Sequence, residues 1–498
     1  MAGALLGIDV GSSSTKVGLF SLQGQKLALA SRPYPTLEPQ SGWKEQQPEH
    51  WWTSVSTALA EIRHETPASD ILGVGVTGHI SSLTFVNASG RPLRPAIGFQ
   101  DQRARGEIEE LYKRFSRDDL AVLLGIDLPP AATWPLPRLL WFCRYEPATL
   151  EKSHRVLQAK DYINFCLTGE FASDASSCRG LVNLADGLPP QQVFSKLGLP
   201  AQLLPKICDP GAIVGRVSTR AAAETGLPDG VPVAGGWNDL NAAVLGSGAV
   251  HAGESFNITG TSEHLGVVTE KEYRVPELLC GPYLPGKKLL YGATLCGGGS
   301  LQWYCKAFRS ELDQLLAQAE QAPAGSESLF FLPYLEGERS PIWDPMATGA
   351  FVGIRSIHSQ RHFVRAILEG VAFGLLQILE LVVRSGQSIS EPMRLAAGTA
   401  RADLWNQIKT DVFGFPCATP EAGHAGVLGA AILGGVAAGI YEDCETAAAQ
   451  MVRLERQYSV SESRHRQYQR QYLRFCELYP ALQECFARMY RSRMESEP

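Results

Sequence analysis

The chain has 498 residues, of which 45% are hydrophobic and 19% charged, and its formal net charge is −6. This length predicts two or three domains with a sizeable core rather than a disordered chain. The acidic balance argues against a general nucleic-acid binder, which would carry a basic excess. Eleven cysteines without a C-x-x-C spacing indicate reduced thiols packed as small hydrophobic groups, not a zinc or disulfide framework.

No segment has the pattern of an export signal or a membrane span. The N-terminus lacks a basic region and a cleavage site, so we expect no signal peptide. The longest apolar run, residues 425–440, contains five glycines and is shorter than the roughly 20 residues that a span requires. It predicts a buried helix, or a loop followed by a helix, in a soluble, cytoplasmic protein without a membrane partner.

The first half of the chain alternates strands and helices. Residues 5–20 contain an apolar strand, a Gly/Ser turn and a second apolar strand, typical of the start of a β-meander. Residues 49–63 have helical periodicity, and residues 71–77 have the pattern of a buried strand. Shorter strands are predicted at residues 84–86 and 95–99. This alternation predicts an α/β protein.

The second half opens in the same way as the first. A short strand at residues 232–236 and an Ala/Gly-rich helix at 239–248 precede a strand, a Gly-Thr-Ser turn and another strand at 254–268. Residues 257–262 (NITGTS) resemble residues 8–13 (IDVGSS). The similarity predicts a duplicated architecture, with the domain boundary near residues 248–254.

The remaining elements continue the α/β pattern. Helices are predicted at residues 362–383 and 404–413, with a strand at 394–397 between them, and residues 446–489 have the pattern of a helical segment charged on one face. The predicted domains are residues 1–250, residues 251–445 and a helical extension, residues 446–498, packed on the second domain.

The turn formed by Gly11, Ser12 and Ser13 has the residue types that bind phosphate. Small residues let backbone N–H groups approach an anion, and the hydroxyls, with Lys16 beyond them, add donors. The preceding strand carries Asp9, which is placed to hold Mg²⁺ through water. Ser/Gly turns between strands are common, so this turn is a weak signal by itself.

The second turn, Gly260-Thr261-Ser262, begins the other half of the chain. It is equally weak alone, since the same residue types occur in ordinary turns. Two such turns, each opening one half, fit a nucleotide that is bound by both domains.

Asp239 ends the segment GGWND, at residues 235–239, between a strand and a helix. Ligands of α/β sheets bind beyond the carboxyl ends of strands. A carboxylate there can accept the proton of a hydroxyl that attacks phosphorus. Asp also favours the N-cap of a helix, so a purely structural role is equally compatible with the sequence.

Several motifs, in order, resemble the FGGY family of carbohydrate kinases. The resemblance extends over residues 5–480 and is most specific at residues 349–373. The motifs are IDVGSS (8–13), RPLRPAIGFQDQRA (91–104), KDYINFCLTGE (160–170), GGWNDLNAAVLG (235–246) and GAFVGIRSIHSQRHFVRAILEGVAF (349–373).

The resemblance implies two ribonuclease-H-like domains of the actin and hexokinase type around a central cleft that binds ATP and Mg²⁺. Carried over by position, Asp239 would be the general base, and Asp9 and Asp239 would lie at the metal. The nucleotide would be bound by Gly11, Ser12, Ser13, Lys16, Gly260, Thr261, Gly298, Gly398, Thr399 and Ala400. The sugar would be bound by His79, Ile80, Ser81, Asp101, Arg103, Trp237, Asp239 and His264. Lys160, Asp174 and Glu369 match family positions at which we expect structural roles.

The chain departs from the family near the substrate. Residues 79–82 (HISS) stand where glycerol kinases have Arg-Glu and xylulokinases have Gln-Met-His-Gly, so glycerol is disfavoured. Phe99 replaces a usual tryptophan. Glu263 and His264 replace small or apolar residues, and we expect them to contact substrate or to form an interdomain hydrogen-bonded pair. Residues 397–399 read Ala-Gly-Thr in place of three glycines, which leaves less room near the nucleoside.

The predicted reaction is the ATP-dependent phosphorylation of a hydroxyl of a small sugar. A ketopentose such as xylulose is favoured because the motifs are closest to those of xylulokinases. Another polyol or sugar, such as erythritol or ribulose, is the alternative. A non-kinase actin-like ATPase is a third reading, but it would normally carry an appended partner-binding domain. The resemblance also suggests a homodimer.

Overall fold

The computed structural model describes residues 3–66, 70–128, 131–396 and 402–496, and the chain forms two compact units. Unit 1 contains the residues as far as Gly248 together with His424–Arg453. Unit 2 contains Ala249–Gly423 and the residues from Leu454 onward. The sequence predicts residues 424–445 in the second domain, but they pack in unit 1.

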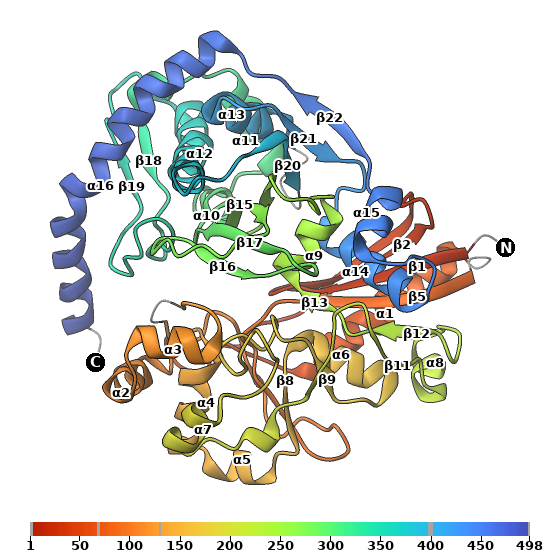
Figure 1. Ribbon diagram of the computed structural model, residues 1–498. Coiled ribbons are helices and arrows are strands. Elements are labelled where there is room, and N and C mark those ends of the chain that lie inside the picture. Colours follow the sequence, from red (N-terminus) through yellow and green to blue (C-terminus); the bar gives the residue numbers. More distant parts are fainter. Residues whose placement is uncertain (1–2, 67–69, 129–130, 397–401, 497–498) are drawn as a thin grey trace. The chain divides into compact units, whose positions relative to one another are not determined.

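A mixed sheet forms the centre of unit 1 (Figure 1). Its strands are β1 (Gly3–Val10), β2 (Ser14–Ser21), β3 (Lys26–Pro33), β5 (Asp70–Gly78), β11 (Ile213–Arg216), β12 (Pro232–Ala234) and β13 (Trp237–Asn238). The order is β11-β12-β5-β1-β2-β3, and β13 also pairs with β5. β1, β2 and β3 form an antiparallel meander, whereas β5 runs parallel to β1, β12 and β13. Among the described residues of unit 1, short two-stranded sheets are formed by β4 (Glu45–Gln46) with β7 (Ala96–Ile97), by β6 (Thr84–Val86) with β8 (Arg155–Leu157), and by β9 (Ala172–Ser173) with β10 (Lys206–Ile207).

Helices cover both faces of this sheet. The helices of unit 1 are α1 (Pro48–Glu65), α2 (Arg105–Arg114), α3 (Arg117–Leu124), α4 (Pro135–Tyr145), α5 (Pro147–Lys152), α6 (Ala159–Thr168), α7 (Gln191–Leu197), α8 (Thr219–Thr225), α9 (Asp239–Gly246), α14 (Ala425–Ala437) and α15 (Cys444–Met451), and those that pack on the sheet include α1, α6, α9 and α14. Helix α1 packs on β2 and β3, while α14 packs on β1 and β5. Helices α2 to α5 and α7 build a second apolar cluster that contains Phe85, Phe142 and Phe194.

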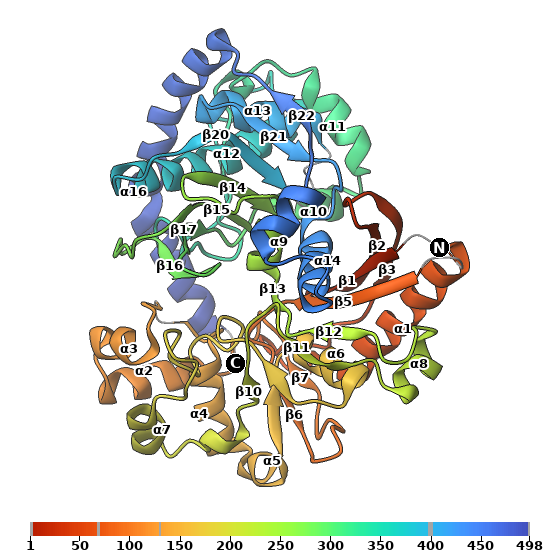
Figure 2. The ribbon, with the colours of Figure 1, turned by 45° about the vertical axis from the view of Figure 1, so that its right-hand side comes forward.

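Helix α14 lies directly on the backbone of strands that come more than 300 residues earlier in the chain (Figure 1, Figure 2). A Cβ atom on Gly7 would stand 1.9 Å from the carbonyl oxygen of Val427, and one on Gly75 would stand 1.8 Å from that of Ala430. Glycine in β1 and β5 is therefore what lets the helix approach so closely. This packing explains why residues 424–453 belong to unit 1, and it confirms the buried helix predicted within residues 425–440.

Unit 2 repeats the topology of unit 1. Its main strands are β14 (Glu254–Thr259), β15 (Glu263–Thr269), β16 (Leu279–Pro282), β17 (Lys288–Ala293), β20 (Ser390–Ala396), β21 (Cys417–Pro420) and β22 (Leu454–Tyr458), in the order β16-β17-β15-β14-β20-β21-β22. The antiparallel meander β14-β15-β17 corresponds to β1-β2-β3, and β20 and β21 run parallel to β14 as β5 and β12 do to β1. The predicted duplication is confirmed.

The other elements of unit 2 are α10 (Gly298–Phe308), α11 (Leu312–Glu320), β18 (Phe330–Leu332), β19 (Ala350–Val352), α12 (Gln360–Arg384), α13 (Asp403–Phe413) and α16 (Glu462–Ser496). The prediction of one helical segment over residues 446–489 is wrong. Helix α15 ends at Met451 in unit 1, and β22 then pairs antiparallel with β21 before α16 begins (Figure 2).

Helix α12 forms the middle of the unit 2 core. A capping box between Ser359 and His362 starts it, and its apolar residues Ile367, Val371 and Ile378 are buried. By length and composition this helix is the single candidate membrane span among the described residues. Since 72% of its apolar window is buried inside the protein, core packing accounts for that composition.

Candidate active site

Asp9 and Asp239 lie at the same edge of the unit 1 sheet. In the parallel register Asp9 of β1 and Trp237 of β13 both pair with Thr77 of β5. The Thr77 hydroxyl also donates to the carbonyl oxygen of Trp237 at 2.8 Å. Because the strands on either side of β5 end together, the two predicted carboxylates are neighbours, and the negative charge of Asp9 raises the pKa of Asp239.

Asp9 has an oxygen atom without a partner. Its Oδ1 is buried and accepts no hydrogen bond from the described residues, while Oδ2 faces Gly426 of α14. Burial raises the pKa of Asp9, and the positive charge of Lys16 partly opposes this. Lys16 is the cross-strand partner of Asp9 in β2, so it lies beside the carboxylate and not on the turn.

Hydrogen bonds to its carbonyl oxygens hold the first turn, Gly11 to Ser13, in place. The Tyr34 hydroxyl donates to the carbonyl oxygen of Gly11, and the Tyr34 N–H donates to that of Ser13 at 3.1 Å. The side-chain amide of Gln46 donates to the carbonyl oxygen of Ser12 at 2.7 Å. Ser12 and Ser13 are exposed. With its carbonyl oxygens engaged, the turn can offer its remaining N–H and hydroxyl groups to an anion.

Asp239 is the first residue of α9, but it is not the cap. The cap is Asn238, whose Oδ1 accepts from the N–H of Asn241 at 2.9 Å. Asp239 accepts from the N–H of Leu240 at 2.8 Å, and its residue surface is exposed. The surrounding protein atoms nevertheless desolvate the carboxylate and, together with the charge of Asp9, raise its pKa to about 6. The purely capping role is therefore wrong.

Buried polar residues hold this segment in place. Asn238 donates to the hydroxyl of Ser176 at 2.8 Å, and that hydroxyl donates to Asp174 at 2.6 Å. Lys160 lies 3.1 Å from Asp174 and donates to the carbonyl oxygen of Gly235 at 3.2 Å. Lys160 and Asp174 therefore have the structural role expected from the sequence, because they position residues 235–238 just before Asp239.

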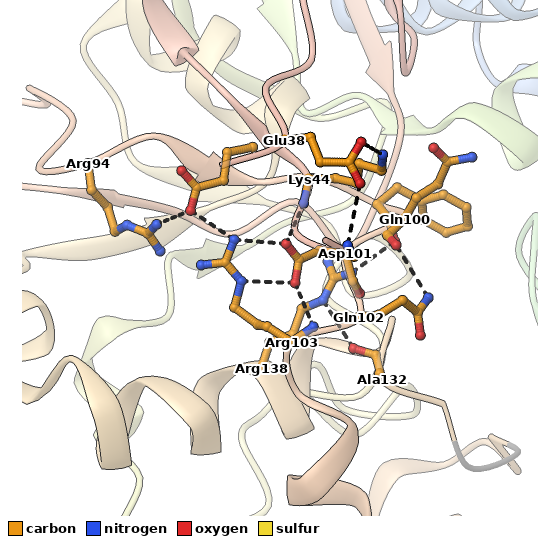
Figure 3. A network of polar contacts seen from close by, with 12 residues as sticks. Glu38, Lys44, Arg94, Gln100, Asp101, Gln102, Arg103, Ala132 and Arg138 are labelled. Carbon is orange, nitrogen blue, oxygen red and sulfur yellow. Dashed lines mark hydrogen bonds and ion pairs between the residues drawn. The ribbon is translucent and has the colours of Figure 1, made fainter. Parts of the chain in front are cut away.

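Asp101 and Arg103 form a buried ion pair (Figure 3). Arg103 donates to Asp101 through Nε at 2.9 Å and through a terminal nitrogen at 2.8 Å, and to Glu45 at 2.8 Å. The backbone N–H groups of Lys44 and Arg103 also donate to Asp101, and the Arg103 guanidinium lies 3.8 Å from the Trp43 ring centroid. Neither side chain of the pair is exposed. Four hydrogen bonds thus occupy the Asp101 carboxylate within the protein, and the sugar contacts of Asp101 and Arg103 stay predictions.

The sequence does not predict the position of Arg138 of α4. It is fully buried, and its guanidinium donates to the carbonyl oxygens of Phe99 at 2.8 Å, Asp101 at 3.0 Å, Ala132 at 3.2 Å and Ser81 (Figure 3). Burial lowers its pKa to about 9, although Asp101 opposes the change. Its one sequence signal is a cation inside the apolar run PLPRLLWF. Arg138 joins three loops, two of which carry predicted sugar residues.

The segment around His79 leaves polar atoms unpaired. His79 is buried, and its Nδ1 donates to the carbonyl oxygen of Val10 at 2.8 Å, so Nε2 is an acceptor. Burial lowers the pKa of this imidazole. That Nε2 and the hydroxyls of Ser81 and Ser82 have no partner within the described chain. Ile80 is half-buried, and Trp237 is only 4% exposed.

The second turn packs on the start of α10 in unit 2. The carbonyl oxygen of Thr261 accepts from the N–H groups of Gly297 at 2.7 Å and Gly299 at 3.0 Å, and that of Gly260 accepts from Gly298 at 3.0 Å. Gly260 and Thr261 are exposed, whereas Gly298 is buried. As in the first turn, the carbonyl oxygens are engaged from within the unit.

Glu263 lies beneath this turn and is fully buried. It forms an ion pair of 2.8 Å with Lys409 and accepts from Asn257 at 2.7 Å. Both predictions for Glu263, a substrate contact and an interdomain pair, are corrected, because these partners lie in unit 2 and the side chain has no exposed surface. His264 is half-buried, with its ring 6.0 Å from that of Tyr291. Gly398, Thr399 and Ala400 lie outside the described residues.

Comparison with known proteins decides the family. Residues 4–246 match the N-terminal domain of the FGGY family of carbohydrate kinases, and residues 256–438 match the C-terminal domain. The chain belongs to the FGGY family of carbohydrate kinases. This FGGY kinase is 32% identical over 440 residues to the xylulose kinase of Escherichia coli (strain K12), covering 87% of this chain and 90% of the relative. It is 30% identical over 461 residues to the xylulose kinase of Bacillus subtilis (strain 168), with coverages of 90% and 91%.

Solved structures of FGGY kinases share the fold. A xyloylose kinase from Brucella ovis superposes with a TM-score of 0.85 at 29% identity, covering 97% of this chain and all of that one. A ligand-bound xylulose kinase from Lactobacillus acidophilus gives 0.87 at 24% identity, with coverages of 98% and 100%. The predicted α/β fold with two domains of the actin and hexokinase type is confirmed, and the protein is a sugar kinase with ATP as phosphate donor.

Proposed function

We propose that this FGGY kinase transfers the γ-phosphate of ATP to a hydroxyl of a ketopentose such as xylulose, with Asp239 as the general base. The observation that carries the proposal is the combination of exposure, hydrogen bonding and pKa at Asp239. The residue is exposed at a strand edge, the helix is capped by Asn238 and not by Asp239, and the pKa of Asp239 is about 6. A base works best when its pKa lies near the working pH.

In the proposed reaction the substrate hydroxyl gives its proton to Asp239 while its oxygen bonds to the γ-phosphorus. The bond between that phosphorus and the oxygen of the β-phosphate breaks, and ADP leaves with the electron pair. The donors of the two turns stabilise the charge on the phosphates. The enzyme works in the cytoplasm, on a small molecule and without a nucleic-acid or membrane partner.

The residues at the sheet edge fit a magnesium ion. Asp9, through its unpartnered Oδ1, and Asp239 would hold it. The described residues contain no group of three or more acidic, histidine or cysteine side chains that could hold a metal. Mg²⁺ commonly uses one or two carboxylates, completed by water and substrate phosphates. When bound, the ion neutralises phosphate charge.

The xylulose preference rests on two observations. The two relatives described above carry that substrate in their names, and the unpaired polar atoms of His79, Ser81 and Ser82 suit a substrate rich in hydroxyl groups. A gluconokinase of Bacillus subtilis (strain 168) is also similar, at 27% identity over 455 residues. Gluconate therefore belongs in the test beside ribulose and erythritol.

The test is a coupled ADP-release assay with MgATP and a panel of xylulose, ribulose, erythritol, gluconate and glycerol. We expect xylulose to give the highest kcat/KM and Asp239→Asn to abolish the stimulation. A preference for another compound would change the assigned substrate but not the assignment of Asp239 as the general base. Hydrolysis of ATP that no compound stimulates and that the variant retains would refute both parts.

A further inference from the structure

Lys409 of α13 lies buried beneath the second turn, which carries Gly260 and Thr261. Its side chain is 2% exposed. Its Nζ donates to Asn257 Oδ1 at 2.8 Å, to Thr259 Oγ1 at 2.9 Å and to Glu263 Oε2 at 2.8 Å. An ammonium group has three donors, so this one is fully used.

Glu263 completes the network. Its Oε2 also accepts from the amide of Asn257 at 2.7 Å and from the hydroxyl of Thr259 at 3.0 Å. Thr259 is the last residue of β14 and Glu263 is the first residue of β15. A single ammonium group therefore binds the residues immediately before and after the turn.

The side chain of Glu263 also packs against the start of α10. A Cβ atom on Gly297 would stand 2.1 Å from Cγ of Glu263, so the glycine packs directly against it. Thr294 makes two hydrogen bonds with the backbone of Glu263. Its N–H donates to the Glu263 carbonyl oxygen at 2.9 Å, and its hydroxyl accepts from the Glu263 N–H at 3.1 Å. The turn, β15 and the beginning of α10 thus share one anchor.

Stability by itself is a weak reason for a buried ion pair. Desolvation offsets much of the attraction, and apolar residues of similar volume often stabilise a core equally well. A fully satisfied polar network fixes geometry more strictly than apolar contacts do. In this protein the network binds the residues on both sides of an exposed turn and so fixes the geometry of that turn.

We propose that Lys409 and Glu263 are positioning residues for the second turn, and that they set the affinity of the enzyme for nucleotide phosphate without contacting it. The inference rests on the proposed function, in which this turn binds the nucleotide. The ligand of this turn is a nucleoside diphosphate or triphosphate, and Lys409 and Glu263 do not affect the binding of the sugar.

The main test uses the double variant Glu263→Gln/Lys409→Met, which removes both charges together. The matched control is Arg365→Met/Glu369→Gln, which removes another buried ion pair of unit 2, of 2.8 Å, on helix α12. For the first variant we expect the KM for ATP and the Kd for MgADP by calorimetry to rise about 10- to 100-fold, the range that a small displacement produces. The KM for the sugar should change less than about twofold, and the control should change neither constant.

Thr259→Val is the milder second variant, in case the double variant does not fold. It removes a hydroxyl that joins Lys409 to the first flank, and we expect a smaller rise of the nucleotide constants alone. Unchanged nucleotide constants in a folded variant, or equal changes in the control, would overturn the inference. Failure of the proposed function is distinguishable, because the wild-type enzyme would then bind no MgADP or show no sugar-stimulated turnover.

Discussion

The side-chain amide of Asn238 caps helix α9, and the carboxylate of Asp239, one residue later, stays outside the capping hydrogen bonds. The helix therefore keeps its cap when Asp239 is replaced. This relationship makes Asp239 a residue whose chemistry can be tested without loss of fold.

Asp239→Asn should lower kcat with xylulose about 100- to 10,000-fold, the usual contribution of a general base. The thermal midpoint should not fall. Asn238→Ala is the opposite case, since losing an N-cap costs about 1 kcal/mol and should lower the midpoint. A normal kcat in Asp239→Asn would contradict the base assignment.

The acid limb of the kcat/KM profile should lie near pH 6. The Asp239 carboxylate must be ionised to accept a proton, and desolvation by the surrounding protein atoms together with the Asp9 charge raises its pKa to about 6. Activity should thus fall about tenfold per pH unit below that value. Asp9→Asn, which removes the repelling charge, should move the limb to lower pH in whatever activity remains. An unmoved limb would assign it to another group.

The same pKa shift has a consequence for stability. A carboxylate whose pKa is raised on folding favours the native state at low pH, and this contribution is lost as the pH rises through the folded value. The thermal midpoint of Asp239→Asn, relative to that of the wild type, should therefore be higher at pH 8 than at pH 4. Melting curves at the two pH values measure this difference.

Tyr34→Phe should weaken nucleotide binding selectively. The change removes the hydroxyl that holds the Gly11 carbonyl oxygen. One such bond is worth about 1 kcal/mol, so we expect the KM for ATP to rise roughly fivefold with little change for the sugar. Tyr441→Phe is the control, since it removes a similar bond of 2.5 Å to the Leu22 carbonyl oxygen elsewhere in unit 1.

Arg138→Met should destabilise unit 1 by at least about 3 kcal/mol, because several buried carbonyl oxygens lose their donor at once. Arg138→Lys should not restore the loss, since a single ammonium group cannot reproduce the fork of donors. Chemical unfolding followed by tryptophan fluorescence measures the change. Equal stability of the wild type and Arg138→Met would show that water replaces the guanidinium.

The sequence predicts those parts of the site that depend on local order. The Gly/Ser turn after Asp9, the similar turn at Gly260 and the strand-to-helix junction at Asp239 are each contained in a few consecutive residues, and the structure has them as predicted. The duplication is visible for the same reason, because its evidence is a short motif that occurs at the start of each half.

Contacts between distant residues could not be predicted in this way. Lys409 meets Glu263 across 146 positions, and Arg138 meets Ser81 across 57. The motif that contains Asp101 gives its residue type but not the burial of its carboxylate. Three of its four hydrogen bonds come from Arg103, two residues later, but the fourth comes from Lys44 and the guanidinium also meets Glu45, which only the folded chain brings together.

The return of α14 to unit 1 also constrains the order in which the protein can form on the ribosome. When Gly248 emerges, β1 and β5 still lack the helix that packs against Gly7 and Gly75, and the whole of Ala249–Gly423 must be synthesised before it appears. The first unit to begin folding is therefore among the last to be finished. A nascent chain arrested before residue 424 should remain protease-sensitive at the uncovered strands.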